Sequence, residues 1–131
     1  MRYRTLAYVA FAMSGVMATM PAVAQPERPF SLSTLKAVQA RGQVVLVDVY
    51  APWCPVCRAQ APTIAALTTD PAFKKLQVLK LDYDHQDAEK KVLAVSKQST
   101  LIAYRGGREV GRLLGVTDPG QIRKFAATAL Q

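Results

Sequence analysis

The chain has 131 residues, of which 50% are hydrophobic, and it carries a formal net charge of +8 at pH 7. This length allows one domain with a single hydrophobic core and excludes a second domain. The basic residues are scattered and are not interleaved with exposed aromatic residues, so we expect no nucleic-acid partner.

Residues 1–24 have the features of a cleaved secretory signal peptide. Arg2 and Arg4 form a short basic start, an apolar run extends from Leu6 to Met20, and Ala22 and Ala24 are small residues at the spacing that a signal peptidase reads. An uncleaved anchor is the alternative, but the apolar run is short for a bilayer span. We therefore expect export to the periplasm, with no stable membrane span after cleavage.

The first elements expected after the signal peptide are a helix and a buried strand. Ser31 or Ser33 can cap the helix, which ends at Gly42, a residue that tolerates the left-handed conformation. The segment Val44–Tyr50 is nearly continuous in β-branched residues, as expected for a central strand covered on both faces. Asp48 interrupts this apolar run, and a carboxyl group in such a place requires an explanation.

The order of the remaining elements predicts the fold class. Gly106 and Gly107 lie between two apolar runs and are a strong signal for a tight hairpin. Parallel crossovers followed by an antiparallel hairpin imply an α/β fold with a mixed central β-sheet and helices on both faces. The other expected elements are an extended leader at 25–30, a helix at 54–67 with Pro62 in its interior, a strand at 78–82, a helix at 87–96 with Val92 and Leu93 on its buried side, strands at 101–104 and 110–114, and a final helix from Asp118.

The two cysteines of the chain follow the predicted buried strand, within Trp53-Cys54-Pro55-Val56-Cys57. Cys54 would lie at the junction of strand and helix, where free backbone N–H groups and the helix dipole favour a thiolate over a thiol. Cys57 would lie about one turn later on the same side, less exposed, and able to attack a mixed disulfide formed at Cys54. A Cys54–Cys57 disulfide closes a very short loop and adds little stability, which favours exchange over a structural role.

Two other uses of the cysteines stay open at this point. Export to an oxidising compartment permits a purely structural disulfide. A metal site would need more ligands, because zinc generally takes four, and only His85 offers a further soft or imidazole group. His85 follows the strand predicted at 78–82, so we expect it to be a loop residue, and we expect no metal and no other cofactor.

With these residues in place, the chain resembles the thioredoxin family over nearly all of residues 25–131. The resemblance rests on the Trp-Cys-Pro-Val-Cys block after an apolar strand, and on Asp48, which comes six residues before the first cysteine. Pro62, Lys80 in the next strand, the Gly-Gly hairpin, Gly115 and the closing amphipathic helix follow in the family's order. The resemblance implies a thioredoxin-like fold and protein thiol–disulfide oxidoreductase activity.

The resemblance also implies roles for individual residues. Asp48 would be a buried acid beneath Cys57, paired loosely with Lys80, and its burial would raise its pKa so that it relays protons to and from Cys57. A position on a solvated face or at a strand end is the alternative for Asp48. Trp53 would cover the redox pair and meet partners. Pro55 is a further candidate substrate-binding residue. Because neither Pro55 nor Val56 donates a side-chain hydrogen bond to the thiolate, these two residues between the cysteines would set the redox poise.

One loop departs from the family's pattern. Thioredoxins place a cis-proline opposite the two cysteines, and Ser99, followed by Thr100, stands where that proline belongs. A cis bond before a non-proline residue costs about 2.5–4 kcal/mol, so we expect the Gln98–Ser99 bond to be trans. Ser99 and Thr100 remain candidate substrate-binding residues. Either the missing proline ring opens the cysteines to metal, or Ser99 donates a hydrogen bond that tunes Cys54.

These observations predict an extracytoplasmic thiol–disulfide oxidoreductase that exchanges disulfides with cysteine-containing exported proteins. Cys54 would attack, Cys57 would resolve, and electrons would pass to or from a membrane redox partner. A reductant is favoured, because strongly oxidising relatives usually carry an extra helical insertion that this chain lacks. The alternatives are a thioredoxin-fold protein that binds or delivers a metal through the same cysteines, and a non-catalytic interaction module.

Overall fold

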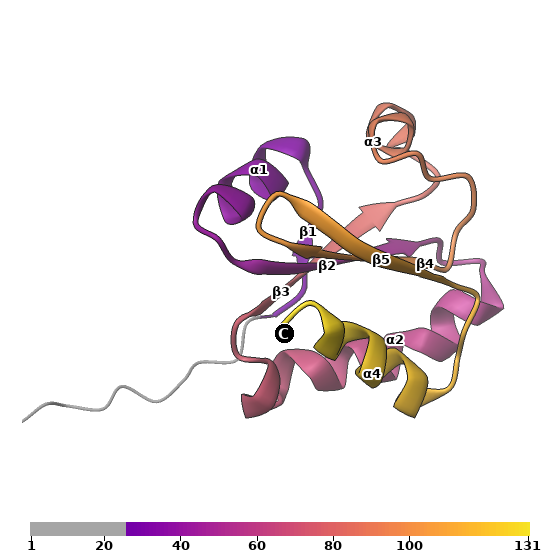
Figure 1. Cartoon of the computed structure of the whole chain (residues 1–131). Coiled ribbons are helices and arrows are strands. Elements are labelled where there is room, and N and C mark those ends of the chain that lie inside the picture. The colour runs from indigo at the N-terminus through magenta and orange to yellow at the C-terminus, as the bar shows by residue number, and fades with distance from the viewer. Residues whose placement is uncertain (1–25) are drawn as a thin grey trace, which may run out of the picture.

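A computed structural model describes residues 26–131 of the chain (Figure 1). The predicted signal peptide, residues 1–24, lies outside the described residues. Within residues 26–131, no helix combines the length and the apolar character needed to cross a membrane.

A five-stranded mixed sheet forms the middle layer of the molecule, with strand order β1-β3-β2-β4-β5. β1 and β2 both pair with β3 in parallel, whereas β4 pairs antiparallel with β2 and with β5. The predicted mixed α/β sheet is therefore confirmed. The strands are β1 (Arg28–Pro29), β2 (Val44–Tyr50), β3 (Leu76–Asp82), β4 (Thr100–Arg105) and β5 (Arg108–Leu114).

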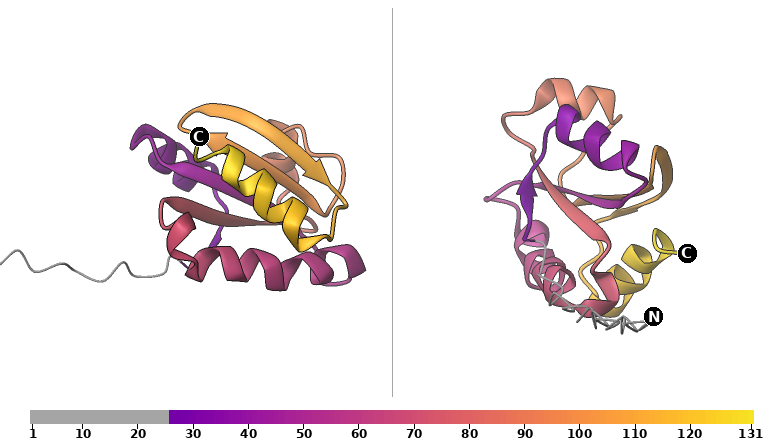
Figure 2. Two further views of the ribbon diagram at one scale, coloured as in Figure 1. Left: turned by 60° about the horizontal axis from the view of Figure 1, so that its bottom comes forward. Right: turned by 90° about the vertical axis from the view of Figure 1, so that its left-hand side faces the viewer.

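Helices cover both faces of this sheet, as the sequence predicted. Figures 1 and 2 show α1 and α3 on one face and α2 and α4 on the other. A single 3₁₀ turn, η1, follows α2 and leads into β3. The helical elements are α1 (Leu32–Ala40), α2 (Pro55–Thr69), η1 (Pro71–Phe73), α3 (Asp87–Val92) and α4 (Pro119–Thr128).

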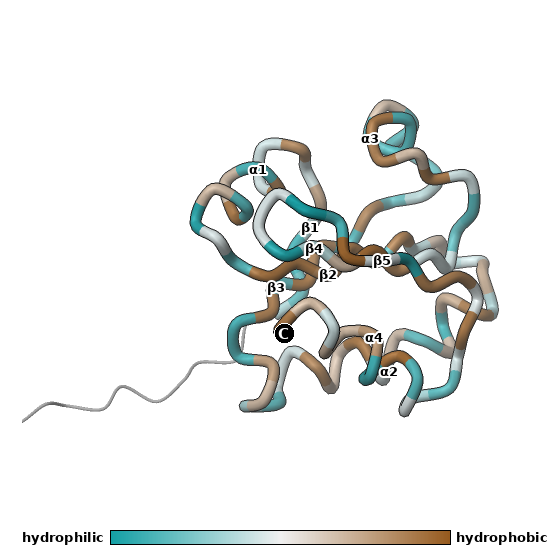
Figure 3. Tube along the Cα trace, in the orientation of Figure 1, coloured by the Kyte–Doolittle hydropathy of each residue, from teal (hydrophilic) through white to brown (hydrophobic). Residues whose placement is uncertain are grey.

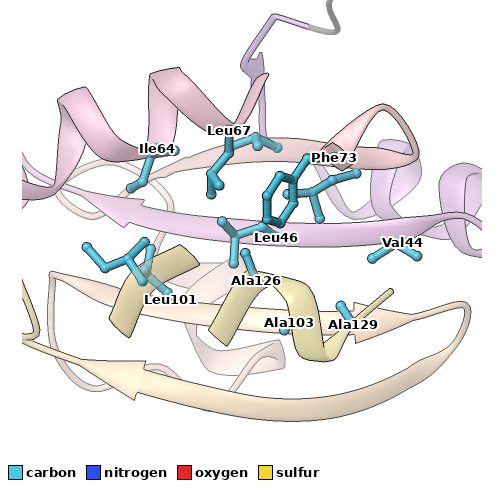
Figure 4. Packing of buried hydrophobic residues seen from close by; sticks show 12 residues of the cluster. Val44, Leu46, Ile64, Leu67, Phe73, Leu101, Ala103, Ala126 and Ala129 are labelled. Atoms are coloured by element: carbon cyan, nitrogen blue, oxygen red, sulfur yellow. The ribbon is translucent and has the colours of Figure 1, made fainter. Parts of the chain in front are cut away.

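The central strand β2 contributes to a separate hydrophobic core on each face. Its odd-numbered valines pack with Leu35 and Val38 of α1, and Leu46 packs with residues of α2 and α4. Figure 3 shows the hydrophobic residues along β2 in the middle of the molecule. Figure 4 shows the Leu46 side chain among Leu67, Phe73 and Ala126. Because both faces are covered, every residue of β2 up to Val49 is buried, and Asp48 is one of them.

Short polar signals begin and end the elements where the sequence predicted them. The Ser31 side chain accepts a hydrogen bond from the Thr34 backbone N–H and caps α1, and Asp118 caps α4 in the same way. Gly42, just after α1, has a φ of +67°, and Gly106 in the hairpin between β4 and β5 has a φ of +54°. Both angles lie in the left-handed region that glycine adopts at little cost.

Two predicted segments differ from the structure. The leader at 25–30 was expected to be merely extended, but its residues Arg28–Pro29 form β1 against β3, and Phe30 is buried. The helix expected at 87–96 ends at Val92, whose side chain is 65% exposed and not in the core. Ala94 follows with a left-handed φ of +51°, and this segment contacts the core through the buried Leu93 and the partly buried Val95.

Candidate active site

Cys54 occupies the N-cap of α2, directly after the turn that follows β2. Its Sγ accepts a hydrogen bond from the Cys57 backbone N–H at 3.1 Å, and Pro55 takes the first helical position. The first N–H groups of a helix have no partner within the helix, and the helix dipole adds a partial positive charge there. This placement gives the Cys54 sulfur a backbone hydrogen-bond donor and the positive end of the helix dipole.

Both cysteines are buried free thiols. Cys54 is 2% exposed and Cys57 is 1% exposed, so the expectation that Cys57 is clearly the more hidden of the two is not met. The Cys57 Sγ lies 3.9 Å from the carbonyl oxygen of Val49. The two thiols therefore differ in their surroundings and not in their exposure.

The pKa of the Cys57 thiol is raised to about 11. Burial is the largest cause and the hydrogen bond with the Cys54 side chain is the next, whereas backbone groups of Ala51 and Ser99 act in the opposite direction. Cys57 therefore keeps its proton at neutral pH until a base removes it. This arrangement suits a resolving thiol and leaves Cys54 as the candidate nucleophile.

Asp48 lies inside the molecule, 1% exposed, on the central strand. Neither carboxyl oxygen has a hydrogen-bond partner among the described residues. Burial raises the pKa of Asp48 to about 7, with the positive charge of Lys80 opposing the rise and the negative charge of Glu27 adding to it. The carboxyl group thus populates both its protonated and its ionised form near neutral pH. Asp48 is also adjacent in the chain to Val49, whose carbonyl oxygen contacts the Cys57 sulfur.

Lys80 lies directly opposite Asp48 in the register of β2 and β3. The resemblance implied a loose pairing between these two residues, but Lys80 forms its ion pair with Glu27, with a distance of 2.6 Å from Nζ to Oε2. The same Nζ lies 4.6 Å from the centre of the Tyr50 ring. The charge of Lys80 acts on Asp48 without an ion pair between them.

Trp53 forms the exposed surface next to the buried sulfurs. Its side chain is 54% exposed, and its indole Nε1 donates to the two carboxylate oxygens of Asp84 at 3.0 and 3.1 Å. The ring meets that of Tyr83 edge-on, with 6.4 Å between ring centres. Pro55 is exposed as well. A partner that approaches Cys54 would therefore meet Trp53 and Pro55 first.

Replacing Asp84 with alanine should free the Trp53 indole at a cost in stability of about 1 kcal/mol or less, because the lost hydrogen bond is exposed. Trp53 is the single tryptophan of the chain, so its fluorescence anisotropy reports this change directly. The anisotropy should fall in Asp84→Ala. Asp87→Ala is the matched control, since Asp87 pairs with Lys90 instead. Equal anisotropy in both variants would contradict the bracing role of Asp84.

Ser99, in the loop opposite the cysteines, and Thr100, the first residue of β4, are buried, with exposures of 6% and 7%. The Gln98–Ser99 bond is trans, as expected, since the described residues contain no cis peptide bond. Ser99 has a left-handed φ of +57°, and its backbone N–H donates to Val49 O at 2.9 Å. Its hydroxyl donates to Gln98 O at 2.6 Å, so the predicted hydrogen bond to Cys54 is not formed.

Ser99→Pro should destabilise the protein by about 2–3 kcal/mol. Proline holds φ near −65° and has no N–H, so it fits neither the left-handed backbone nor the hydrogen bond to Val49 O. Urea unfolding measures the loss. Ser99→Ala, which keeps the N–H and removes only the hydroxyl, is the control and should cost about 1 kcal/mol. A Ser99→Pro protein as stable as the wild type would mean that the loop adopts another backbone conformation.

Gln60 is a buried site residue that the sequence analysis missed. It is 0% exposed, lies one turn after Cys57 in α2, and donates from Nε2 to Val116 O at 2.8 Å and to Ser99 O at 3.4 Å. Gln60 therefore joins the helix that carries the cysteines to two loops around them. Its spacing of three residues from Cys57 on one helix face was the available signal.

His85 lies in the turn after β3, which confirms that it is a loop residue. It is exposed, and its Nδ1 lies 2.8 Å from an Asp82 carboxylate oxygen. Residues 26–131 contain no group of three or more His, Cys, Asp or Glu side chains arranged to hold a metal ion. The structure therefore does not favour the metal-binding alternative.

Comparison with known proteins agrees with this fold and this cysteine pair. The family model described as Thioredoxin matches residues 33–128. Thioredoxin-2 of Saccharomyces cerevisiae is 38% identical over 95 residues, which cover 70% of this chain and 86% of that protein. The crystal structure of Trxlp from Edwardsiella tarda has a TM-score of 0.74 and 44% identity, covering 76% of this chain and 97% of its own. A thioredoxin structure from Malassezia sympodialis, with a TM-score of 0.73 and 21% identity over 83% of this chain and 94% of its own, supports the fold alone. The chain therefore belongs to the thioredoxin family and is a protein thiol–disulfide oxidoreductase.

Proposed function

We propose that this oxidoreductase exchanges disulfides with cysteine-containing proteins outside the cytoplasm, in the periplasm. The basic start, apolar run and small residues of residues 1–24 support export. Cleavage there would leave the thioredoxin-like domain at residues 25–131. The observation that carries the exchange reaction is the pair of thiols at the start of α2, with Cys54 at its N-cap and Cys57 hydrogen-bonded to it.

Exchange would begin with the Cys54 thiolate attacking one sulfur of a client disulfide. The client disulfide breaks, its second sulfur leaves as a thiolate, and a mixed disulfide joins Cys54 to the client. Cys57 then gives its proton to the ionised carboxylate of Asp48 and attacks the Cys54 sulfur. This step forms the Cys54–Cys57 disulfide and releases the remaining client thiolate. The client has gained two electrons, and this protein has lost two.

The client would dock on the exposed side chains beside the cysteines. Trp53, 54% exposed, and Pro55 are available for contact. Ser99 and Thr100 are buried, so they would act by shaping the loop that faces the client and not through their side chains.

A reductant is the direction that we favour. Strongly oxidising relatives usually carry an extra helical insertion, and residues 26–131 contain four α-helices and one 3₁₀ turn in the order expected without it. Acting as a reductant requires a supply of electrons, which we assign to a membrane redox partner. The oxidised Cys54–Cys57 disulfide would be reduced by that partner after each cycle.

Two measurements test the proposal. The reduction potential of the Cys54–Cys57 pair should lie near that of thioredoxin, about −270 mV, and a value near −120 mV would identify an oxidant. Cell fractionation of the full chain, with N-terminal sequencing of the product, should recover a periplasmic protein that begins near Gln25. A full-length protein retained in the cytoplasm would overturn the proposed location.

A further inference from the structure

Glu27 and Lys80 form an ion pair beside the buried carboxyl group of Asp48. The Lys80 Nζ lies 2.6 Å from the Glu27 Oε2, with the two side chains only 35% and 21% exposed. Glu27 precedes β1 and lies outside residues 33–128, the part of the chain that matches the family. The pair therefore joins the N-terminal segment of the chain to strand β3 of the central sheet.

The segment that carries Glu27 is fixed in place. Pro29 is paired with Lys80 in the register of β1 and β3, and the Phe30 backbone N–H donates to Lys80 O at 2.8 Å. The Gln86 side chain donates from Nε2 to Phe30 O at 3.0 Å, and the Phe30 side chain is buried. Glu27 is thus held immediately before an anchored strand.

The Lys80 side chain lies near the carboxyl groups of Asp48 and Glu27, and it pairs with Glu27, the more exposed of the two. Neighbouring strands lie about 4.8 Å apart, and Lys80 is directly opposite Asp48, so its long side chain starts beside the Asp48 carboxyl group. Its Nζ nevertheless bonds to Glu27 and lies over the Tyr50 ring. Asp48 is left without a hydrogen-bond partner in the described residues.

We propose that Glu27 is a positioning residue, which holds Lys80 away from Asp48 and thereby keeps Asp48 able to accept and release a proton near neutral pH. The inference rests on the proposed role of Asp48 as the base for Cys57. With Lys80 paired to Asp48 instead, the pKa of the carboxyl group would fall, and the carboxylate would be a weaker base toward the Cys57 thiol.

The charges around Asp48 act in the directions that this role requires. Burial of the carboxyl group favours its protonated form, the Lys80 charge on β3 favours the ionised form, and the Glu27 charge favours the protonated form. From α2, the titratable thiol of Cys57 lies against the peptide of Val49, and from β4 the paired residue is the apolar Leu101. Glu27 therefore acts on Asp48 twice, through its own charge and through the position of Lys80.

A pocket gives this ion pair contact with water. It measures about 420 Å³, and Glu27, Lys80, Tyr50 and Pro52 are among the residues that line it. Pro52 belongs to the turn that leads to Cys54. The Glu27–Lys80 pair therefore lines a pocket that extends to the turn leading to Cys54.

The experiment is a ¹³C NMR titration of the Asp48 carboxyl group in the reduced protein. Glu27→Gln should lower its titration midpoint by about half a pH unit or more, because a negative charge is lost and Lys80 is freed to approach Asp48. Lys80→Met should raise the midpoint. Glu109→Gln is the matched control, since it neutralises an ion-paired carboxylate on β5 and should leave Asp48 unchanged.

The double variant separates the two ways in which Glu27 acts. In the Lys80→Met background, Glu27→Gln should shift the midpoint by less than it does in the wild type, because only the direct charge remains. An equal shift in both backgrounds, or no shift in the wild type, would overturn the inference. The pH profile of mixed-disulfide resolution tests the proposed function separately. If the Asp48 midpoint shifts and the pH profile does not, Asp48 is not the proton acceptor for Cys57.

Discussion

Cys54→Ser should abolish disulfide exchange, whereas Cys57→Ser should allow the first step and stop the reaction at a mixed disulfide. Cys54 is the candidate nucleophile, since its sulfur lies at the N-cap of α2 and accepts a hydrogen bond from the Cys57 backbone N–H. The Cys57 thiol has a pKa raised to about 11 and acts only after it loses its proton. A serine hydroxyl performs neither task.

The exchange rate of Cys54→Ser with a model disulfide should fall by roughly three orders of magnitude or more, as expected when a nucleophile is removed. Mass spectrometry of Cys57→Ser after reaction should detect one client molecule bound per protein. Arg58→Ala is a useful control, because Arg58 borders the motif and its side chain bonds, among residues 26–131, only to Pro52 O. If Cys54→Ser forms the stable adduct and Cys57→Ser does not, the two roles are reversed.

The fold followed from local signals in the sequence. The apolar run predicted β2 with its observed bounds, Val44–Tyr50, because burial on both faces leaves an uninterrupted run of β-branched residues. The hairpin at Gly106 and the caps at Ser31 and Asp118 could also be predicted from the sequence, since each depends on a single residue and its neighbours. Strand β1 was missed because two residues that include a proline carry no strand pattern.

The contacts of the site that join residues far apart in the sequence could not be predicted from local patterns. The pairing of Lys80 with Glu27 joins positions that are far apart in the sequence, and no local pattern specifies it. The same holds for Gln60, whose carbonyl acceptors lie in two separate loops. The left-handed backbone of Ser99 is also a product of its surroundings, because serine on its own does not favour a positive φ.

The effect of Asp48→Asn on the free energy of unfolding should be more favourable at pH 8 than at low pH, by up to about 4 kcal/mol. The ordinary pKa of the carboxyl group is 3.8, and burial raises it to about 7 in the folded state. Between these values the folded protein binds a proton that the unfolded chain does not, so stability falls as pH rises from about 4 to about 7. About three pH units at about 1.4 kcal/mol each give the size of this loss.

Asparagine cannot ionise, so the stability of the variant does not fall in this way as the pH rises. Its amide also lacks hydrogen-bond partners in this site, which costs about 1–3 kcal/mol at every pH and makes the pH dependence the reliable readout. Urea unfolding of both proteins at pH 4 and pH 8 measures it. Asp84→Asn is the control, because Asp84 is exposed and its effect should vary far less between the two pH values. An equal stability difference at pH 4 and pH 8 would contradict a buried, titrating Asp48.

The same substitution should slow the resolution of the mixed disulfide by about tenfold or more at pH 7, because general-base assistance to Cys57 is lost. Single-turnover mixing with a client disulfide measures this step. A variant that is more stable at pH 8 but resolves the mixed disulfide more slowly would show that Asp48 serves the reaction and not the fold. A carboxyl group with only a structural role would not destabilise the protein. A carboxyl group that only changed the local charge would not control the proton transfer from Cys57. If resolution is unchanged in Asp48→Asn, the proton of Cys57 must leave by another route, and the ion pair of Glu27 and Lys80 has no kinetic role.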